Sequence, residues 1–424
     1  MKKHIKNAFL LYCALLICQI IAQSIICFND ALYSEQYYTF WHFSEWLINY
    51  EGGFVRRGLI GEIILSIYSA FNIDISLLLY ILCYLSTFAL IILIIILFKK
   101  KGLSQLLIPT VILLGGFAIN IIPAYRRDAL MLLIIYLVLY LFREYEKKQT
   151  TPIYILFCIV GILVILVHEA SFFCFAPFVF IHQYINLKDL GFEKRIIKSI
   201  VTLLPIIVSM GTVCIYKGDQ ETADIIWNSY SSFFTAKFNH IPAIGLGVKA
   251  LTWNSVDTFW FHFCTNYTEP IIEYVPRFFA WVAIMFFTFY LCANVNKVRM
   301  FSYEKDIDSV SLTTILIIQF IALMPLFTVL SCDLRRIIMY WTITTFFIFT
   351  LMDNQYKNSG FINSFAERTI KFFNRSKILS NEYFYIFIAI IIICPYSGFP
   401  INIATKTSVI GNIIEIANRF ISLI

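Results

Sequence analysis

The amino-acid sequence predicts an all-α, polytopic integral membrane protein with about eleven transmembrane helices, its N-terminus inside and its C-terminus outside. Hydrophobic residues make up 60% of the chain, charged residues only 14%, and the mean hydropathy is +0.78. Soluble domains contain about 25% charged residues. Apolar runs of about 18 residues or more, long enough to cross a hydrocarbon core of about 30 Å, recur along the whole sequence. These observations exclude a soluble protein and predict a single membrane domain over residues 1–424.

Each expected span follows one apolar run. The basic opening MKKHIKN precedes an apolar stretch without a small-residue cleavage site, so we expect a retained first span rather than a signal peptide. The cysteines lie mostly inside apolar runs and show no metal-ligand spacing, so neither a metal site nor a cofactor is expected. The expected spans are residues 8–28, 76–98, 104–123, 128–142, 152–169, 171–186, 198–216, 272–294, 310–331, 334–352 and 383–400.

Residues 58–73 are expected to form a helix that lies in the outer interface rather than a span. The segment is apolar but short, and Glu62 interrupts it. If it crossed the membrane, the lysine cluster at 99–101 would move to the outer side, against the positive-inside rule. With the N-terminus inside, the cytoplasmic segments contain 21 of the 33 lysines and arginines, and the outer segments contain the other 12.

Two large outer segments, 29–75 and 217–271, are rich in aromatic residues. These residues can form the aromatic belt of a membrane interface or platforms on which sugar rings stack, and the sequence leaves both open. The inside segment 353–382 is polar and basic and is expected to be an ordinary cytoplasmic loop. The net charge of +7 is spread over loops that face lipid headgroups, so no nucleic-acid partner is expected.

Three arginine pairs lie on the outer side, which the positive-inside rule makes poor in arginine. Paired cations at membrane depth are costly and usually functional, and guanidinium forks match phosphate oxygens. Helix N-termini add partial positive charge at the same place. The sequence therefore predicts a pyrophosphate site near the outer membrane surface. The pairs are Arg56-Arg57 in EGGFVRRG, Arg126-Arg127 in YRRDALML and Arg335-Arg336 in CDLRRIIMYW.

A structural alternative exists for two of these pairs. Asp128 and Asp333 can be helix N-caps, with the neighbouring arginines reaching outward to lipid headgroups. Because all three pairs lie on the disfavoured side, we favour the anion site.

The dipeptide His168-Glu169 lies in a tight hairpin between two expected spans, where an ionisable pair is unlikely to face lipid. It can be structural, with Glu169 bonded to a local N–H group or an arginine. It can also bind substrate or transfer protons, since nearby cations tune such groups for general base chemistry. Asp30, directly after the first span, is a further candidate carboxylate.

Three motifs in this order resemble the bacterial Wzy-type O-antigen polymerases and the related EpsG-like polysaccharide polymerases. They are YRRDALMLLIIYL at the head of one span, HEASFFCFAPF a few tens of residues later, and DLRRIIMYW near the end. The resemblance covers roughly residues 120–345 and consists of short motifs. The chain departs from the family pattern in the doubled arginine followed by Asp128 and in the glutamate that follows His168.

The resemblance implies a metal-independent glycosyltransferase at the periplasmic face of the bacterial cytoplasmic membrane. It would pass a glycan from undecaprenyl pyrophosphate to the terminal sugar of a lipid-linked repeat unit. The six arginines would bind the pyrophosphate, and a chain-length regulator is an open further partner. His168, Glu169 or Asp30 would activate the acceptor hydroxyl. The acceptor or sugar would contact Tyr125, Asp128, Asp333 and Tyr340.

Two other functions stay open. One is a GT-C-like glycosyltransferase that uses a polyprenyl-phosphate sugar, with Asp30 as its base. The other is a transporter of lipid-linked oligosaccharides, which predicts charges along a path through the membrane and often two related halves. Here the charges gather at one face and no repeat is evident, so the transporter is the third choice.

Overall fold

The computed structural model describes residues 41–101, 126–263, 282, 285–286, 288–297, 306–331, 334–352 and 360–375, and every regular element in these ranges is a helix. The elements are α3 (Trp41–Trp46), α4 (Gly58–Phe71), α5 (Ile75–Lys101), α7 (Asp128–Lys148), α8 (Thr151–Val167), α9 (Ser171–Asn186), α10 (Phe192–Ile215), α11 (Gln220–Ser229), α12 (Ser231–Phe238), α13 (Leu246–Lys249), η2 (Ala250–Thr252), α14 (Ser255–Phe263), η4 (Val295–Lys297), α16 (Ser309–Ala322), the π-helix η5 (Leu326–Leu330), α17 (Leu334–Leu351) and α18 (Gly360–Arg375).

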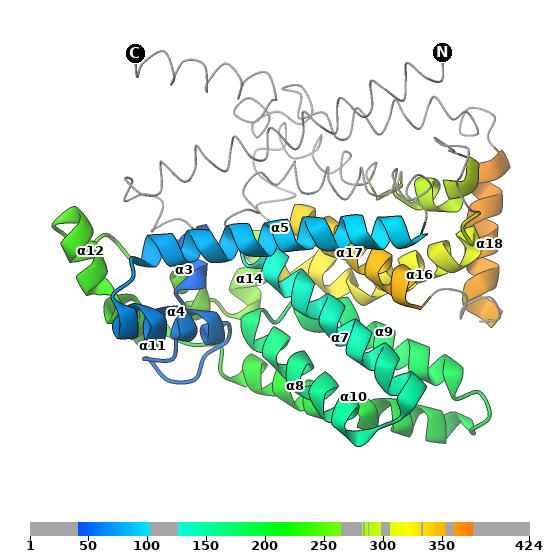
Figure 1. Cartoon of the computed structure of the whole chain (residues 1–424), viewed down its shortest axis with the longest axis horizontal. Coiled ribbons are helices and arrows are strands. Elements are labelled where there is room, and N and C mark those ends of the chain that lie inside the picture. The colour runs from blue at the N-terminus through cyan, green and yellow to red at the C-terminus, as the bar shows by residue number, and fades with distance from the viewer. Residues whose placement is uncertain are drawn as a thin grey trace, which may run out of the picture.

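Helices α7 to α10 form an up-and-down bundle because short connections join consecutive helices. Figure 1 shows these four helices side by side, with α5 crossing the described part above them. Helix α7 has 21 residues, so its ends lie about 30 Å apart at a rise of about 1.5 Å per residue. The start of α7, the α8–α9 turn and the end of α10 therefore meet at one end of the bundle. The α7–α8 and α9–α10 connections meet at the other end of the bundle.

The main apolar core fills the space between this bundle and the helices α16 and α17. Ile135 of α7, Val164 of α8 and Phe178 of α9 are fully buried in it. Trp341 of α17 is also fully buried and donates its indole N–H to the carbonyl of Leu316, 2.8 Å away. Burial of these side chains fixes the position of α17 against α7.

A second core holds α3, α4 and α5 against the short helices α11 to α13. Its centre contains Trp46 and Tyr230, both fully buried. The backbone of α4 lies directly on the chain before it, since a Cβ atom on Gly61 would lie 1.9 Å from the carbonyl oxygen of Ile48. The Gly247 amide donates to the Ser44 hydroxyl at 2.8 Å and joins α13 to α3. These contacts hold α3 against the end of the bundle where the α8–α9 turn lies.

The count of about eleven membrane spans stays a prediction. Among the described residues, two helices are long and apolar enough to cross a membrane, Ile75–Leu97 and Phe192–Ile215, and four shorter apolar helices accompany them. The helix expected at 58–73 is present as α4. The expected spans 8–28, 104–123 and 383–400, and much of 272–294, lie outside the described residues.

Three expectations about the elements need correction. The expected span 310–331 is two helices, because α16 ends at Ala322 and η5 begins after Pro325, whose ring removes an N–H donor. The expected loop 353–382 contains α18, which buries Asn363, Ala366 and Phe373 at helical spacing. The outer segment 217–271 contains the helices α11 to α14 and is not an open loop.

Candidate functional site

A cavity of about 440 Å³ opens at the end of the bundle where α7 begins and α8 turns into α9. Its lining side chains are of two kinds, and we name the polar ones the polar wall and the apolar and aromatic ones the apolar wall. The polar wall is formed by Arg56, Arg57, Arg126, His168, Glu169, Lys217 and Arg336. The apolar wall includes Phe173, Met210, Val213, Trp253, Phe261, Leu326, Leu330 and Ile337.

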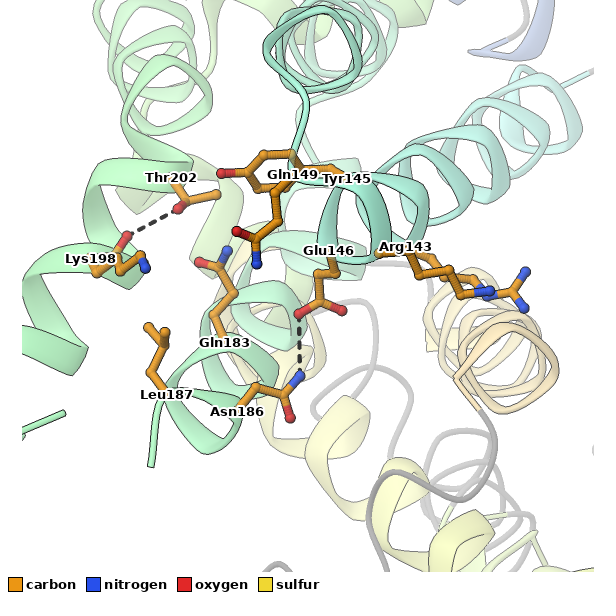
Figure 2. A pocket seen from close by; sticks show the side chains of 10 residues that line it. Arg143, Tyr145, Glu146, Gln149, Gln183, Asn186, Leu187, Lys198 and Thr202 are labelled. Atoms are coloured by element: carbon orange, nitrogen blue, oxygen red, sulfur yellow. Dashed lines mark hydrogen bonds between the residues drawn. The ribbon is translucent and has the colours of Figure 1, made fainter. Parts of the chain in front are cut away.

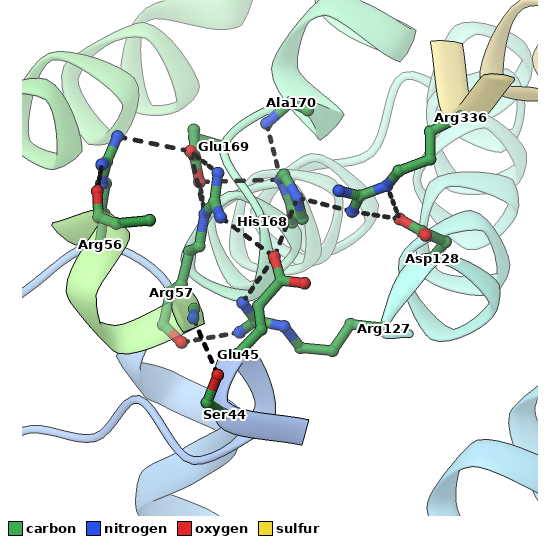
Figure 3. A network of polar contacts seen from close by, with 12 residues as sticks. Ser44, Glu45, Arg56, Arg57, Arg127, Asp128, His168, Glu169, Ala170 and Arg336 are labelled. Atoms are coloured by element: carbon green, nitrogen blue, oxygen red, sulfur yellow. Dashed lines mark hydrogen bonds and ion pairs between the residues drawn. The ribbon is translucent and has the colours of Figure 1, made fainter. Parts of the chain in front are cut away.

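Glu45 of α3 is the centre of the charged network behind this cavity (Figure 3). Its side chain is fully buried. Its Oε1 atom lies 3.0 Å from Arg57 Nη1, 3.3 Å from Arg127 Nη2 and 3.5 Å from His168 Nε2. Burial acts to raise the pKa of Glu45, but Arg127, Arg336 and Arg57 outweigh it and hold that pKa well below its usual range. The carboxylate is therefore ionised and balances several buried cations.

Arg57 links the loop before α4 to the α8–α9 turn. Its Nε donates to both carboxylate oxygens of Glu169, at 2.8 Å and 3.0 Å, and its Nη2 donates to the same group. Its backbone has a φ of 66°, a left-handed conformation that is costly for a residue with a Cβ atom. The Arg127 guanidinium also donates to the Arg57 carbonyl at 2.9 Å. Ion pairs and a backbone contact thus hold Arg57 in a strained conformation at the cavity wall.

Arg127 lies behind the cavity and is completely buried. Of its donors, Nη1 bonds to the Arg57 carbonyl, whereas Nε and Nη2 have no hydrogen-bond partner within the described part of the chain. Within the same described part, its ion pair is with Glu45. Because this buried guanidinium makes so few bonds, it depends strongly on the Glu45 carboxylate to compensate its charge.

Arg336 of α17 makes a second ion pair, with Asp128 at the start of α7. The Arg336 Nη2 atom lies 2.7 Å from Asp128 Oδ1, and the Tyr340 hydroxyl donates to the same oxygen. Nη2 also lies 3.2 Å from His168 Nε2. The structural alternative does not hold for Asp128 and Arg127. The first turn of α7 has no side-chain cap bond from Asp128, and Arg127 does not reach outward.

His168 follows the last residue of α8, since the helix ends at Val167 and not at the expected residue 169. Its Nδ1 atom accepts a hydrogen bond from the Ala170 amide at 3.2 Å. Its Nε2 atom lies 3.5 Å from Glu45 Oε1 and 3.2 Å from Arg336 Nη2. The imidazole bridges the Glu45 cluster and the Arg336–Asp128 pair, and one edge of it faces the cavity.

Among the described residues, the site has more basic than acidic side chains. Six basic side chains line the cavity or belong to the network behind it: Arg56, Arg57, Arg126, Arg127, Lys217 and Arg336. Three carboxylates accompany them: Glu45, Asp128 and Glu169. Since these acids do not balance the bases, the cavity suits an anion. Lys217 is exposed, and Arg56, Glu169 and Arg57 keep 21%, 17% and 16% of their side chains exposed.

Most of the residues that the sequence singled out come together here. Seven of them line the cavity: Arg56, Arg57, Arg126, His168, Glu169, Arg336 and Tyr340. Arg127 and Asp128 lie behind it. Arg335 belongs to α17, but its side chain is not described, and Asp30, Tyr125 and Asp333 lie outside the described residues. Glu45 was not anticipated, although it is an isolated charge in the apolar, aromatic stretch WHFSEWLIN.

The fold and the site define an all-helical protein with a cationic cavity at one end of an apolar helix bundle. Residues 10–230 match the family described as "Uncharacterised membrane protein Rv1490", and the chain belongs to this family. The protein is therefore a membrane protein. The match includes α3 to α10 and ends before α17, which carries Arg336. No curated protein and no solved structure matches the chain.

Proposed function

We propose that this protein is a membrane glycosyltransferase that polymerises oligosaccharide repeat units carried on a polyprenyl pyrophosphate. The observation that carries the proposal is the composition of the 440 Å³ cavity, which is lined by both basic and apolar side chains. A lipid pyrophosphate has the same two parts. The substrates are the growing glycan and a lipid-linked repeat unit, and the site faces the outer side of a bacterial cytoplasmic membrane.

The pyrophosphate occupies the basic wall. Arg56, Arg126 and Arg336 approach the cavity from three separate segments, so their guanidinium groups can bind different oxygens of one anion. Lys217 adds a further positive charge. As the bond to the sugar breaks, negative charge grows on the departing pyrophosphate, and fixed cations stabilise that charge without reorganisation.

The lipid chain lies along the apolar wall. Leu326 and Leu330 belong to the π-helix η5, and both line the cavity. Leu330 is 44% exposed at the outer surface of the described part. Short π-helical segments often occur at functional sites. An isoprenoid chain on this wall would leave the cavity past η5 into the bilayer, and Trp253 and Phe261 would offer ring faces to a sugar.

Glu169 takes the role of general base. The acceptor hydroxyl loses its proton to Glu169, its oxygen bonds to the anomeric carbon, and the bond from that carbon to the pyrophosphate breaks with its electron pair on the leaving group. In the unliganded site Arg57 and Arg56 neutralise Glu169. A bound pyrophosphate competes for these guanidinium groups and makes the carboxylate more basic. His168 orients the site between Glu45 and Arg336.

The polymerase is preferred to the two other candidates. A GT-C-like enzyme with Asp30 as its base stays the second candidate. A transporter needs polar groups along its path, whereas Ile135, Val138 and Leu139 fill the middle of α7 and are fully buried among apolar side chains.

The test is a deletion of the gene in its own host, complemented by variants. The deletion strain is expected to display single repeat units on its surface and to accumulate lipid-linked repeat units. Glu169→Gln should lower the polymerisation rate by about 10²–10⁴-fold, and Arg336→Lys should rescue poorly because the planar fork is lost. Glu144→Gln, at the opposite end of α7, is the matched control and should restore long chains. Long chains in the deletion strain would refute the proposal.

A further inference from the structure

A second cavity, of about 310 Å³, lies at the opposite end of the bundle from the arginine site (Figure 2). It is formed by the last turns of α7 and α9 and the first half of α10. The length of α7 places it about 30 Å from Asp128, so it is a separate site. In the expected topology this end of the bundle faces the cytoplasm. Most of its lining side chains are polar: Arg143, Glu146, Lys147, Gln149, Gln183, Asn186, Lys198 and Thr202.

Gln183 provides an acceptor that has no partner among the described residues. Its side chain is only 8% exposed and lines this cavity. Its Oε1 atom is buried and makes no hydrogen bond to any described residue. Figure 2 shows its amide group pointing into the space between Gln149, Thr202 and Lys198. A buried amide oxygen without a donor costs about 1–3 kcal/mol, and a ligand with a hydroxyl or amine group would supply that donor.

Glu146 is a second acceptor, and its neighbours fix its position. One carboxylate oxygen lies 2.7 Å from Nε2 of the fully buried His182. The other accepts a hydrogen bond from the Asn186 amide at 3.2 Å. These contacts orient Glu146 and leave each oxygen a further lone pair for a donor on a ligand.

Lys198 supplies positive charge on the other side of the cavity. Figure 2 shows it on α10, across the cavity from Glu146. Lys147, also on the lining, is a second ammonium group on α7. The Arg143 guanidinium points away from the other labelled side chains. The cavity thus has Lys198 on α10, Lys147 and the oriented Glu146 on α7, and the buried acceptor of Gln183 on α9.

We infer that this cavity binds a phosphate ester whose alcohol part carries hydroxyl or amine groups. The phosphate lies against Lys198 and Lys147, and the donors of the alcohol part bond to Gln183 Oε1 and Glu146. Two sources provide this chemistry: a phospholipid headgroup of the adjoining leaflet, and a soluble phosphate monoester. The inference does not depend on the proposed function, because no residue of this cavity belongs to the arginine site.

The experiment measures binding of both sources to the purified full-length protein. For the lipid source, native mass spectrometry compares retention of phosphatidylglycerol, which has headgroup hydroxyls, with retention of phosphatidylcholine, which has none. For the soluble source, calorimetry titrates sn-glycerol 3-phosphate into protein held in a phosphate-free detergent. One of the two donor-bearing probes is expected to bind, and phosphatidylcholine is expected to bind more weakly than phosphatidylglycerol if the lipid is the ligand.

Variants then assign the binding to this cavity. Lys198→Gln and Gln183→Met should each weaken binding about ten-fold, the loss expected for one charge-assisted contact. Lys148→Gln removes a charge from an exposed lysine that pairs with Glu144 outside the cavity, and it should bind as the wild type does. Lys198 is exposed, so its variant will fold even if the buried Gln183→Met does not. Equal binding by Lys198→Gln and Lys148→Gln, or binding of neither probe, would overturn the inference.

Discussion

Replacing Glu45 by glutamine tests whether one buried carboxylate holds the arginine site together. The substitution keeps the shape of the side chain and removes its charge. The Glu45 Oε1 atom lies 3.0 Å from Arg57 Nη1, 3.3 Å from Arg127 Nη2 and 3.5 Å from His168 Nε2. Breaking a buried ion pair costs about 3–5 kcal/mol because the remaining charge is uncompensated. We expect a loss of about 3 kcal/mol, since Arg57 keeps Glu169 while Arg127 keeps no described carboxylate.

The free energy of unfolding is measured by titrating the purified protein with a denaturing detergent in mixed micelles. Glu144→Gln is the control, because Glu144 pairs with Lys148 at 3.1 Å on the exposed surface of α7. Removal of that pair should cost less than about 0.5 kcal/mol. Arg127→Met should lower the free energy of unfolding less in the Glu45→Gln background than in the wild type, because the charges of Arg127 and Glu45 are coupled.

Two results would refute the reasoning. One is a free energy of unfolding for Glu45→Gln equal to that of Glu144→Gln. The other is simple additivity of the Glu45 and Arg127 substitutions, which would mean that the pair does not interact in the folded protein.

Three further outcomes are expected. Gly61→Ala should lower the free energy of unfolding by about 1–3 kcal/mol or more, because its Cβ would meet the Ile48 carbonyl. Gly191→Ala has open space around it and should leave the free energy of unfolding unchanged in the same titration. Arg57→Gly should be about 1 kcal/mol more stable than Arg57→Ala, because glycine adopts the left-handed backbone without strain. The folded pKa of Glu45 lies below its unfolded value of about 4.3, so its stabilisation is complete above that pH and is lost as the pH falls through the folded pKa. The stability difference between wild type and Glu45→Gln should therefore shrink in acid, and a constant difference across the titration would contradict this account.

The helices were predictable where apolar runs are long and bounded by charge. Residues 76–98 and 171–186 coincide closely with α5 and α9 because burial of an apolar surface decides both the run and the helix. The residues at which the helices begin and end were less predictable. Helix α10 begins at Phe192 rather than at 198, because its first turns are amphipathic rather than uniformly apolar. The break before η5 follows from Pro325, a signal that was present in the sequence.

The arginine pairs could be grouped from topology, but their individual roles could not. Expected topology places 56–57, 126–127 and 335–336 on one side, and the structure brings Arg57, Arg127 and Arg336 into one network. Nothing in the dipeptides distinguishes the arginine that lines a cavity from the one that is buried. Arg126 lines the cavity and Arg127 does not. That difference arises because α3 places Glu45 behind the start of α7, which is a tertiary contact.

The depth of each charge suggests how the site combines stability with binding. Glu45, Arg127 and Asp128 form an inner layer that is essentially inaccessible, with exposed fractions of 0%, 0% and 1%. Ion pairs in this layer compensate buried charges and fix the positions of α3, α7 and α17. Arg56 and Glu169 form an outer layer that remains partly exposed. Among the described groups of the site the bases outnumber the carboxylates, and Arg56 of the outer layer lines the cavity that a ligand would enter. Substitutions in the inner layer should therefore alter the free energy of unfolding first, whereas substitutions in the outer layer should alter ligand affinity while the fold persists.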